Sequence, residues 1–66
     1  MTENDALDET TTVRWEDAID ELRRHGLLAW KQDGMIYAEG EDEVWIVATI
    51  VDNMVKTATI MRFLGY

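Results

Sequence analysis

The sequence contains no cysteine, no proline and no serine, and His25 is its single histidine. Without cysteine there is no disulfide, no thiolate zinc site and no thiol redox chemistry. The shortage of nucleophiles and of imidazole also removes most nucleophile–base pairs of covalent catalysis. These absences predict a binding protein rather than an enzyme, and one that needs neither a cofactor nor a metal ion.

Basic residues are also scarce: 14 acidic residues stand against 6 basic ones, and the formal net charge is −8. The acids are concentrated in two blocks, residues 16–21 and 39–43, whereas residues 22–32 have a local excess of bases. Affinity for phosphate comes from lysine and arginine, so a surface of this charge repels nucleic acids and anionic membranes. We therefore expect no direct binding to nucleic acid or to a membrane.

A chain of 66 residues has room for one small domain. Its longest apolar stretch, residues 44–51, is much shorter than the ~20 residues that span a bilayer. The first residues are acidic, whereas a signal or transit peptide is basic and apolar. These features predict a monomeric protein that acts in the cytoplasm.

The N-terminal part of the chain is predicted to contain a flexible acidic arm and then a helix. Residues 1–11 have few apolar side chains, and a single domain is expected over residues 12–66. Thr11 or Thr12 would cap the helix, and Gly26 would end it. The apolar residues that recur at helical spacing are Trp15, Ala18, Ile19 and Leu22.

Four strands are predicted after the helix, over residues 27–31, 35–39, 44–51 and 55–63. Between the first two, Asp33-Gly34 is typical of a two-residue hairpin turn, and β-branched residues dominate the third segment. The predicted fold is α+β, with one N-terminal helix packed on a four-stranded antiparallel meander (α-β-β-β-β). Apolar residues at helical spacing within residues 44–63 leave an alternative, α-β-β-α with a long second helix.

The carboxylates of the two acidic blocks are the candidate binding residues. Like charges four residues apart, such as Glu16 and Asp20, destabilise a helix by a few tenths of a kcal/mol. The helix dipole favours acids in the first turn only, so it leaves Asp20 and Glu21 unexplained. Clustered carboxylates attract proteins with a basic groove for nucleic acid. The predicted partner-binding residues are Glu16, Asp17, Asp20, Glu21, Glu39, Glu41, Asp42 and Glu43.

The aromatic residues allow two interpretations. Trp15 and Trp45 lie within the apolar patterns of the helix and the third strand and are predicted to belong to the core. Trp30 and Tyr37 lie on the two strands of the first hairpin. They belong either to the core or to an exposed aromatic anchor beside the carboxylates, which is the residue mixture of a protein–protein hot spot.

The blocks Glu16-Asp17-x-x-Asp20-Glu21 and Glu39-x-Glu41-Asp42-Glu43, on a small cysteine-free domain, resemble phage-encoded anti-CRISPR proteins. The resemblance is to the DNA-mimic type that inhibits type I Cascade, and it lies in size and charge over the whole chain rather than in a shared motif. It implies an inhibitor that binds a subunit of the CRISPR surveillance complex inside a bacterial host and keeps target DNA out.

Two other functions fit the same composition. An acidic immunity protein or antitoxin would use its carboxylates to neutralise a nuclease toxin. A protein of a salt-adapted organism would be acidic for solubility alone, without any mimicry. A requirement for high salt in folding would separate that last interpretation from both inhibitor functions.

Overall fold

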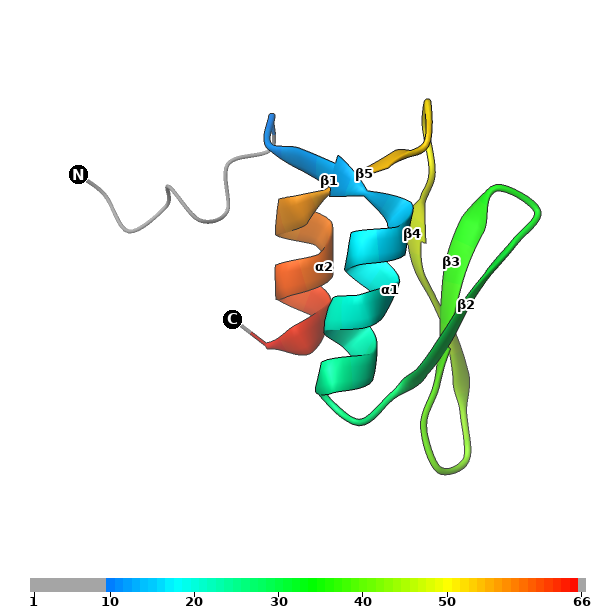
Figure 1. Cartoon of the computed structure of the whole chain (residues 1–66). Coiled ribbons are helices and arrows are strands. Elements are labelled where there is room, and N and C mark those ends of the chain that lie inside the picture. The colour runs from blue at the N-terminus through cyan, green and yellow to red at the C-terminus, as the bar shows by residue number, and fades with distance from the viewer. Residues whose placement is uncertain (1–9, 66) are drawn as a thin grey trace.

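Two helices pack against one face of a three-stranded antiparallel sheet in the computed structural model, which describes residues 10–65 (Figure 1). The elements are β1 (Thr12–Arg14), α1 (Trp15–Arg24), β2 (Leu28–Gln32), β3 (Met35–Glu39), β4 (Val44–Thr49), β5 (Met54–Lys56) and α2 (Thr57–Leu64). The sheet has the order β2-β3-β4, while β1 and β5 form a separate antiparallel ribbon. The predicted α+β class is confirmed. Residues 1–9 of the predicted acidic arm lie outside the described residues.

Helix α1 begins later than the sequence predicts. Thr12 belongs to β1, and the N-cap position is held by Arg14 in an extended conformation without a side-chain capping bond. The prediction that Thr11 or Thr12 caps the helix is therefore wrong. β-branched residues favour strands. Residues 12–14 therefore pair with β5 as a strand, and neither threonine caps the helix.

The end of α1 is the one that the sequence predicts. Gly26 has a φ of 89°, and its N–H donates to the carbonyl of Arg23 at 2.9 Å. The N–H of Leu27 donates to the carbonyl of Leu22 at 3.2 Å. These two bonds form a Schellman motif, in which glycine takes the left-handed conformation at low cost. The motif turns the chain directly into β2.

The hairpin between β2 and β3 also agrees with its prediction. Gln32 pairs with Met35, so the loop consists of Asp33 and Gly34 alone. Both loop residues have positive φ, 55° and 76°, as a type I′ turn requires. The register that follows places Trp30 opposite Tyr37 across the two strands.

The predicted fourth strand, residues 55–63, is wrong, and the sheet has three strands instead of four. Only Met54–Lys56 is extended, and it pairs with β1, while Thr57–Leu64 forms α2. As a helix this segment buries Ala58 and Ile60. The alternative of a long helix over 44–63 is wrong as well, because β4 occupies its first part.

The core lies between the helices and the sheet and is small. Its largest fully buried side chains are Leu22 of α1, Ile36 of β3 and Val55 of β5. Trp15 and Trp45 are half-buried and pack against this cluster without being among its buried residues, so the prediction that both belong to the core holds only in part. Three elements from distant parts of the sequence therefore meet in a single apolar cluster.

Truncating a leucine in the core and truncating one on the outer face of the sheet should have different costs. Leu22→Ala leaves a cavity at a fully buried site and should lower the free energy of unfolding by about 2–5 kcal/mol. Leu28, on β2, is 66% exposed, and Leu28→Ala should cost less than about 1 kcal/mol. Urea denaturation followed by circular dichroism measures both. Equal costs would contradict the exposure of the outer sheet face.

Candidate functional site

Two of the predicted carboxylates on α1 are paired with bases. Glu21 accepts a hydrogen bond from Nη1 of Arg24 at 2.6 Å, and its other carboxylate oxygen lies 3.8 Å from Nδ1 of His25. Glu16 lies 3.7 Å from Nε of Arg14. The two arginine pairs are at the surface, where each contributes about 0–1 kcal/mol. They therefore add little to the stability of the fold.

The other two carboxylates of α1 are exposed and free. Asp17 and Asp20 make no hydrogen bond or ion pair with any residue in the part of the chain that the structure describes. The buried side of α1 is formed by Ala18, Ile19 and Leu22. Asp17 and Asp20 occupy the opposite side of the helix. We call Glu16, Asp17, Asp20 and Glu21 the α1 acids.

The second acidic block forms the tip of the β3–β4 hairpin. The N–H of Gly40 donates to the carbonyl of Glu43 at 2.9 Å, and the indole N–H of Trp45 donates to Oε1 of Glu43 at 2.8 Å. A Cβ on Gly40 would lie 2.5 Å from the Trp45 ring, so only glycine lets the indole lie against the loop. Trp45 also packs edge-on against Phe63 of α2, with ring centroids 5.6 Å apart. We call Glu39, Glu41, Asp42 and Glu43 the hairpin acids.

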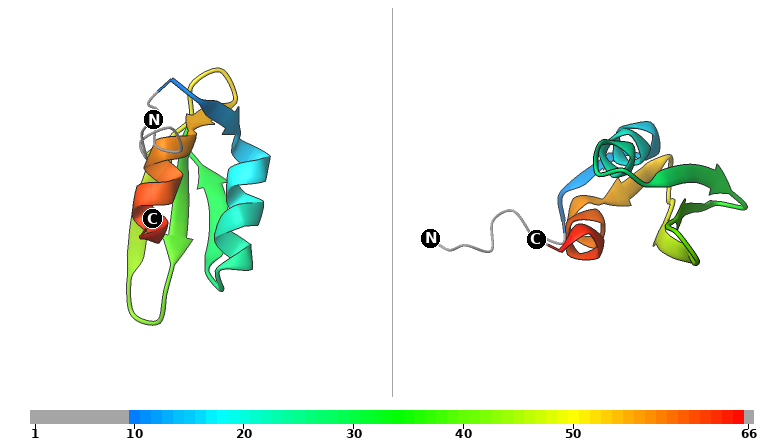
Figure 2. Two further views of the ribbon diagram at one scale, coloured as in Figure 1. Left: turned by 90° about the vertical axis from the view of Figure 1, so that its left-hand side faces the viewer. Right: turned by 90° about the horizontal axis from the view of Figure 1, so that it is seen from below.

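The structure separates these two groups instead of joining them in one surface. Two views show the hairpin tip beyond the C-terminal end of α1 (Figures 1 and 2). Glu16 and Asp17 lie in the first turn of the helix, at its other end. The last turn carries Arg23 and Arg24. The eight predicted residues therefore form two acidic clusters, with bases at the end of α1 nearer the hairpin.

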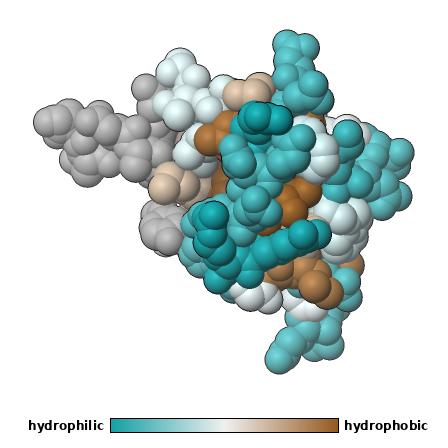
Figure 3. All heavy atoms as spheres, in the orientation of Figure 1, coloured by the Kyte–Doolittle hydropathy of each residue, from teal (hydrophilic) through white to brown (hydrophobic). Residues whose placement is uncertain are grey.

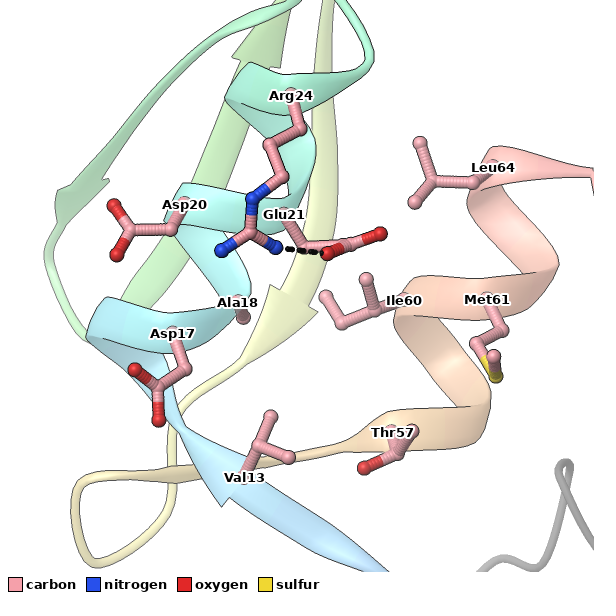
Figure 4. A pocket seen from close by; sticks show the side chains of 10 residues that line it. All are labelled: Val13, Asp17, Ala18, Asp20, Glu21, Arg24, Thr57, Ile60, Met61 and Leu64. Atoms are coloured by element: carbon pink, nitrogen blue, oxygen red, sulfur yellow. Dashed lines mark hydrogen bonds and ion pairs between the residues drawn. The ribbon is translucent and has the colours of Figure 1, made fainter.

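A groove of about 470 Å³ lies between α1 and α2 (Figure 4). Its lining comes from separate segments of the chain, so no single stretch of the sequence predicts it. Ile60 and Leu64 point from α2 toward α1, and Glu21 points from α1 toward α2. The apolar lining is completed by Val13, Ala18 and Met61. The space-filling view, in the orientation of Figure 1, shows hydrophobic residues among hydrophilic ones in the middle of this face (Figure 3).

A buried hydroxyl lines the same groove. Oγ1 of Thr57, the first residue of α2, has almost no accessible surface and no hydrogen-bond partner. Buried polar atoms without a partner are uncommon, because leaving one unpaired costs about 1–3 kcal/mol. Neither this atom nor the groove was predicted, since both depend on the contact between α1 and α2.

The outer face of the sheet, opposite the helices, carries exposed apolar side chains. The rings of Trp30 and Tyr37 stack with centroids 5.8 Å apart and planes 8° from parallel. In register with them lies Ile46, which is 60% exposed. Of the two interpretations left open for Trp30 and Tyr37, neither holds in full, because both rings are half-buried on this face and outside the core cluster. The exposure of Ile46 was not predicted from the sequence. The outer face is a second surface that a protein partner could cover.

The described part of the chain shows no candidate metal centre. Residues 10–65 contain no group of three or more histidine, cysteine or acidic side chains placed to hold a metal ion. His25 is the C-cap of α1, where Nδ1 lies 3.1 Å from the carbonyl oxygen of Glu21. None of the helices within residues 10–65 is long and apolar enough to cross a bilayer.

Removing the buried hydroxyl should not destabilise the protein. Thr57→Val keeps the shape of the side chain and deletes the unpaired Oγ1, so the free energy of unfolding should rise by up to about 1 kcal/mol. Thr59→Val, on the same helix, is the matched control and should have little effect. Urea denaturation measures both. A clear loss of stability in Thr57→Val alone would show that the hydroxyl has a partner in the free protein.

Comparisons with known proteins assign no family to this arrangement. No family model, no curated protein and no solved structure matches the chain. Function must therefore be inferred from the α1 acids, the hairpin acids, the groove and the outer sheet face themselves.

Proposed function

We propose that this protein binds a basic nucleic-acid-binding protein through its carboxylates and competes with nucleic acid for that partner. The observation that carries the proposal is the pair of exposed carboxylates on α1, Asp17 and Asp20, which no base neutralises within residues 10–65. Unpaired carboxylates at a net charge of −8 create a negative field that draws in a basic groove.

The spacing of the α1 acids along the helix is compatible with mimicry of DNA phosphates. From residue 16 to residue 21 the helix rises about 7.5 Å, at 1.5 Å per residue. Phosphates on one strand of DNA advance about 3.4 Å per step along the axis. The α1 acids therefore cover about two phosphate steps. The hairpin acids, at the other end of the molecule, would supply a second contact with the same partner.

The partner class that we propose is a subunit of a CRISPR surveillance complex in the bacterial cytoplasm. The small, acidic, cysteine-free chain resembles the anti-CRISPR proteins that act as DNA mimics. Bound in the basic groove, the protein would keep target DNA out and would have no catalytic role. A nuclease toxin, neutralised by the same carboxylates, is the second partner class to test.

The test is the binding of target DNA by a type I surveillance complex in the presence of this protein. The double variant Asp17→Asn/Asp20→Asn raises the net charge by 2 and should weaken inhibition about tenfold or more. The matched control, Gln32→Lys/Thr49→Lys, makes the same change in net charge at exposed positions of the sheet. It should inhibit like the wild type. Fluorescence anisotropy of labelled DNA at low and at high salt measures the competition.

Other outcomes would redirect or overturn the proposal. Inhibition that is unaffected by neutralising both the α1 acids and the hairpin acids would contradict electrostatic mimicry. Equal losses in the double variant and its control would mean that only net charge matters. Inhibition of a nuclease toxin, with no effect on the surveillance complex, would identify the protein as an immunity protein. Folding that requires molar salt would favour the interpretation that the acidic residues serve solubility alone.

A further inference from the structure

We infer that the groove between α1 and α2 is a docking site for a basic amphipathic helix of the partner protein. This inference rests on the proposed function and deepens it, because it names the part of the partner that is recognised. It requires a groove of suitable length, an apolar floor, a negative rim and the absence of a suitable occupant within this chain.

The length and floor of the groove suit a short helical segment. Helix α2, which forms one wall, has eight residues and is about 12 Å long. That length accommodates about two turns of a docked helix, whose apolar side chains at positions i, i+3 or i+4 and i+7 would face the floor. Ile60 and Leu64 of α2 and Ala18 of α1 form the floor (Figure 4).

The rim of the groove requires a basic occupant. The α1 residues that line it include three acids, Asp17, Asp20 and Glu21, and one base, Arg24, which is already paired with Glu21. Glu21 points toward α2, whereas the carboxylates of Asp17 and Asp20 point from α1 away from α2 (Figure 4). The residues that α2 contributes to the lining, Thr57, Ile60, Met61 and Leu64, are all uncharged. An apolar floor with a net negative rim selects a helix that has apolar residues on one face and lysine or arginine beside them.

Thr57, one of the residues that line the groove, carries a buried hydroxyl. Its Oγ1 is unpaired and has almost no accessible surface in the free protein, so a docked segment would reach it only after the Thr57 side chain turned into the groove. A polar side chain on the docked segment would give this hydroxyl the hydrogen bond that it lacks. Such a bond would favour a segment with a polar residue at one end over a purely apolar one.

Neither this chain's own first residues nor a second copy suits the groove. Residues 1–9 contain four acids and no lysine or arginine, so the rim would repel them. A second copy of the chain also has a net charge of −8, so the two copies would repel each other. The occupant is therefore expected to come from a protein of opposite charge.

The test uses three synthetic helical peptides of equal length against the full chain. The first has leucine at i, i+3, i+4 and i+7 and lysine elsewhere, the second replaces leucine by alanine, and the third replaces lysine by glutamine. The first should bind about tenfold more tightly than either of the others. NMR chemical-shift changes of the labelled protein should be concentrated in Trp15–Arg24 and Thr57–Leu64.

A variant in the groove and one outside it separate docking from general attraction. Met61→Asp places a charge in the apolar lining and should weaken binding of the first peptide about tenfold. Val51→Asp introduces the same charge at a residue that is 64% exposed and outside the groove, and should leave binding within about twofold. If Met61→Asp unfolds by circular dichroism, the milder Met61→Ala takes its place and should weaken binding in the same direction.

The outcomes distinguish this inference from the proposed function. Equal binding of the leucine and alanine peptides, or shifts confined to Leu28, Trp30 and Ile46 on the outer sheet face, would overturn the groove as the site. DNA competition that depends on the α1 acids would still support the proposed function in that case. Specific peptide docking without any DNA competition would support the groove and contradict the mimicry.

Discussion

The burial of one face of the sheet under two helices is the constraint from which the other features follow. Leu22, Ile36 and Val55 come from a helix, the sheet and the ribbon, and their cluster joins the three parts. A domain of this size buries only about 60% of the surface of its unfolded chain. It covers one face of its sheet, which leaves the outer face with Ile46 exposed and the groove between α1 and α2 open.

Helix α1 connects this core to the proposed function. Its inner side supplies core residues, and its outer side carries Asp17 and Asp20 without neutralising bases in the described chain. Repulsion between such carboxylates costs a helix only a few tenths of a kcal/mol per pair, which burial of a single leucine outweighs. The fold therefore tolerates a charge pattern that does not favour stability and that the proposed binding would use. The same helix forms the acidic rim of the groove.

Local signals in the sequence predicted the elements that depend on local chemistry. The apolar stripe of α1, its end at Gly26 and the Asp33-Gly34 turn were all expected and are all present. The pairing of β1 with β5 was missed, and α2 was anticipated only as part of a longer helix over residues 44–63, because both depend on contacts between the two ends of the domain. The carboxylates could be listed from the sequence, whereas their division into two clusters and the groove could not.

Hydrogen–deuterium exchange of the protein, alone and bound to a type I surveillance complex, tests the central claim most directly. Mass spectrometry would follow the backbone amides of each element in both states. The account predicts that binding slows exchange in α1 and α2, and that added target DNA reverses the effect. Protection confined to β2 and to the parts of β3 and β4 away from the hairpin acids would contradict it, because the apolar outer face of the sheet, and not the carboxylates, would then carry the interaction.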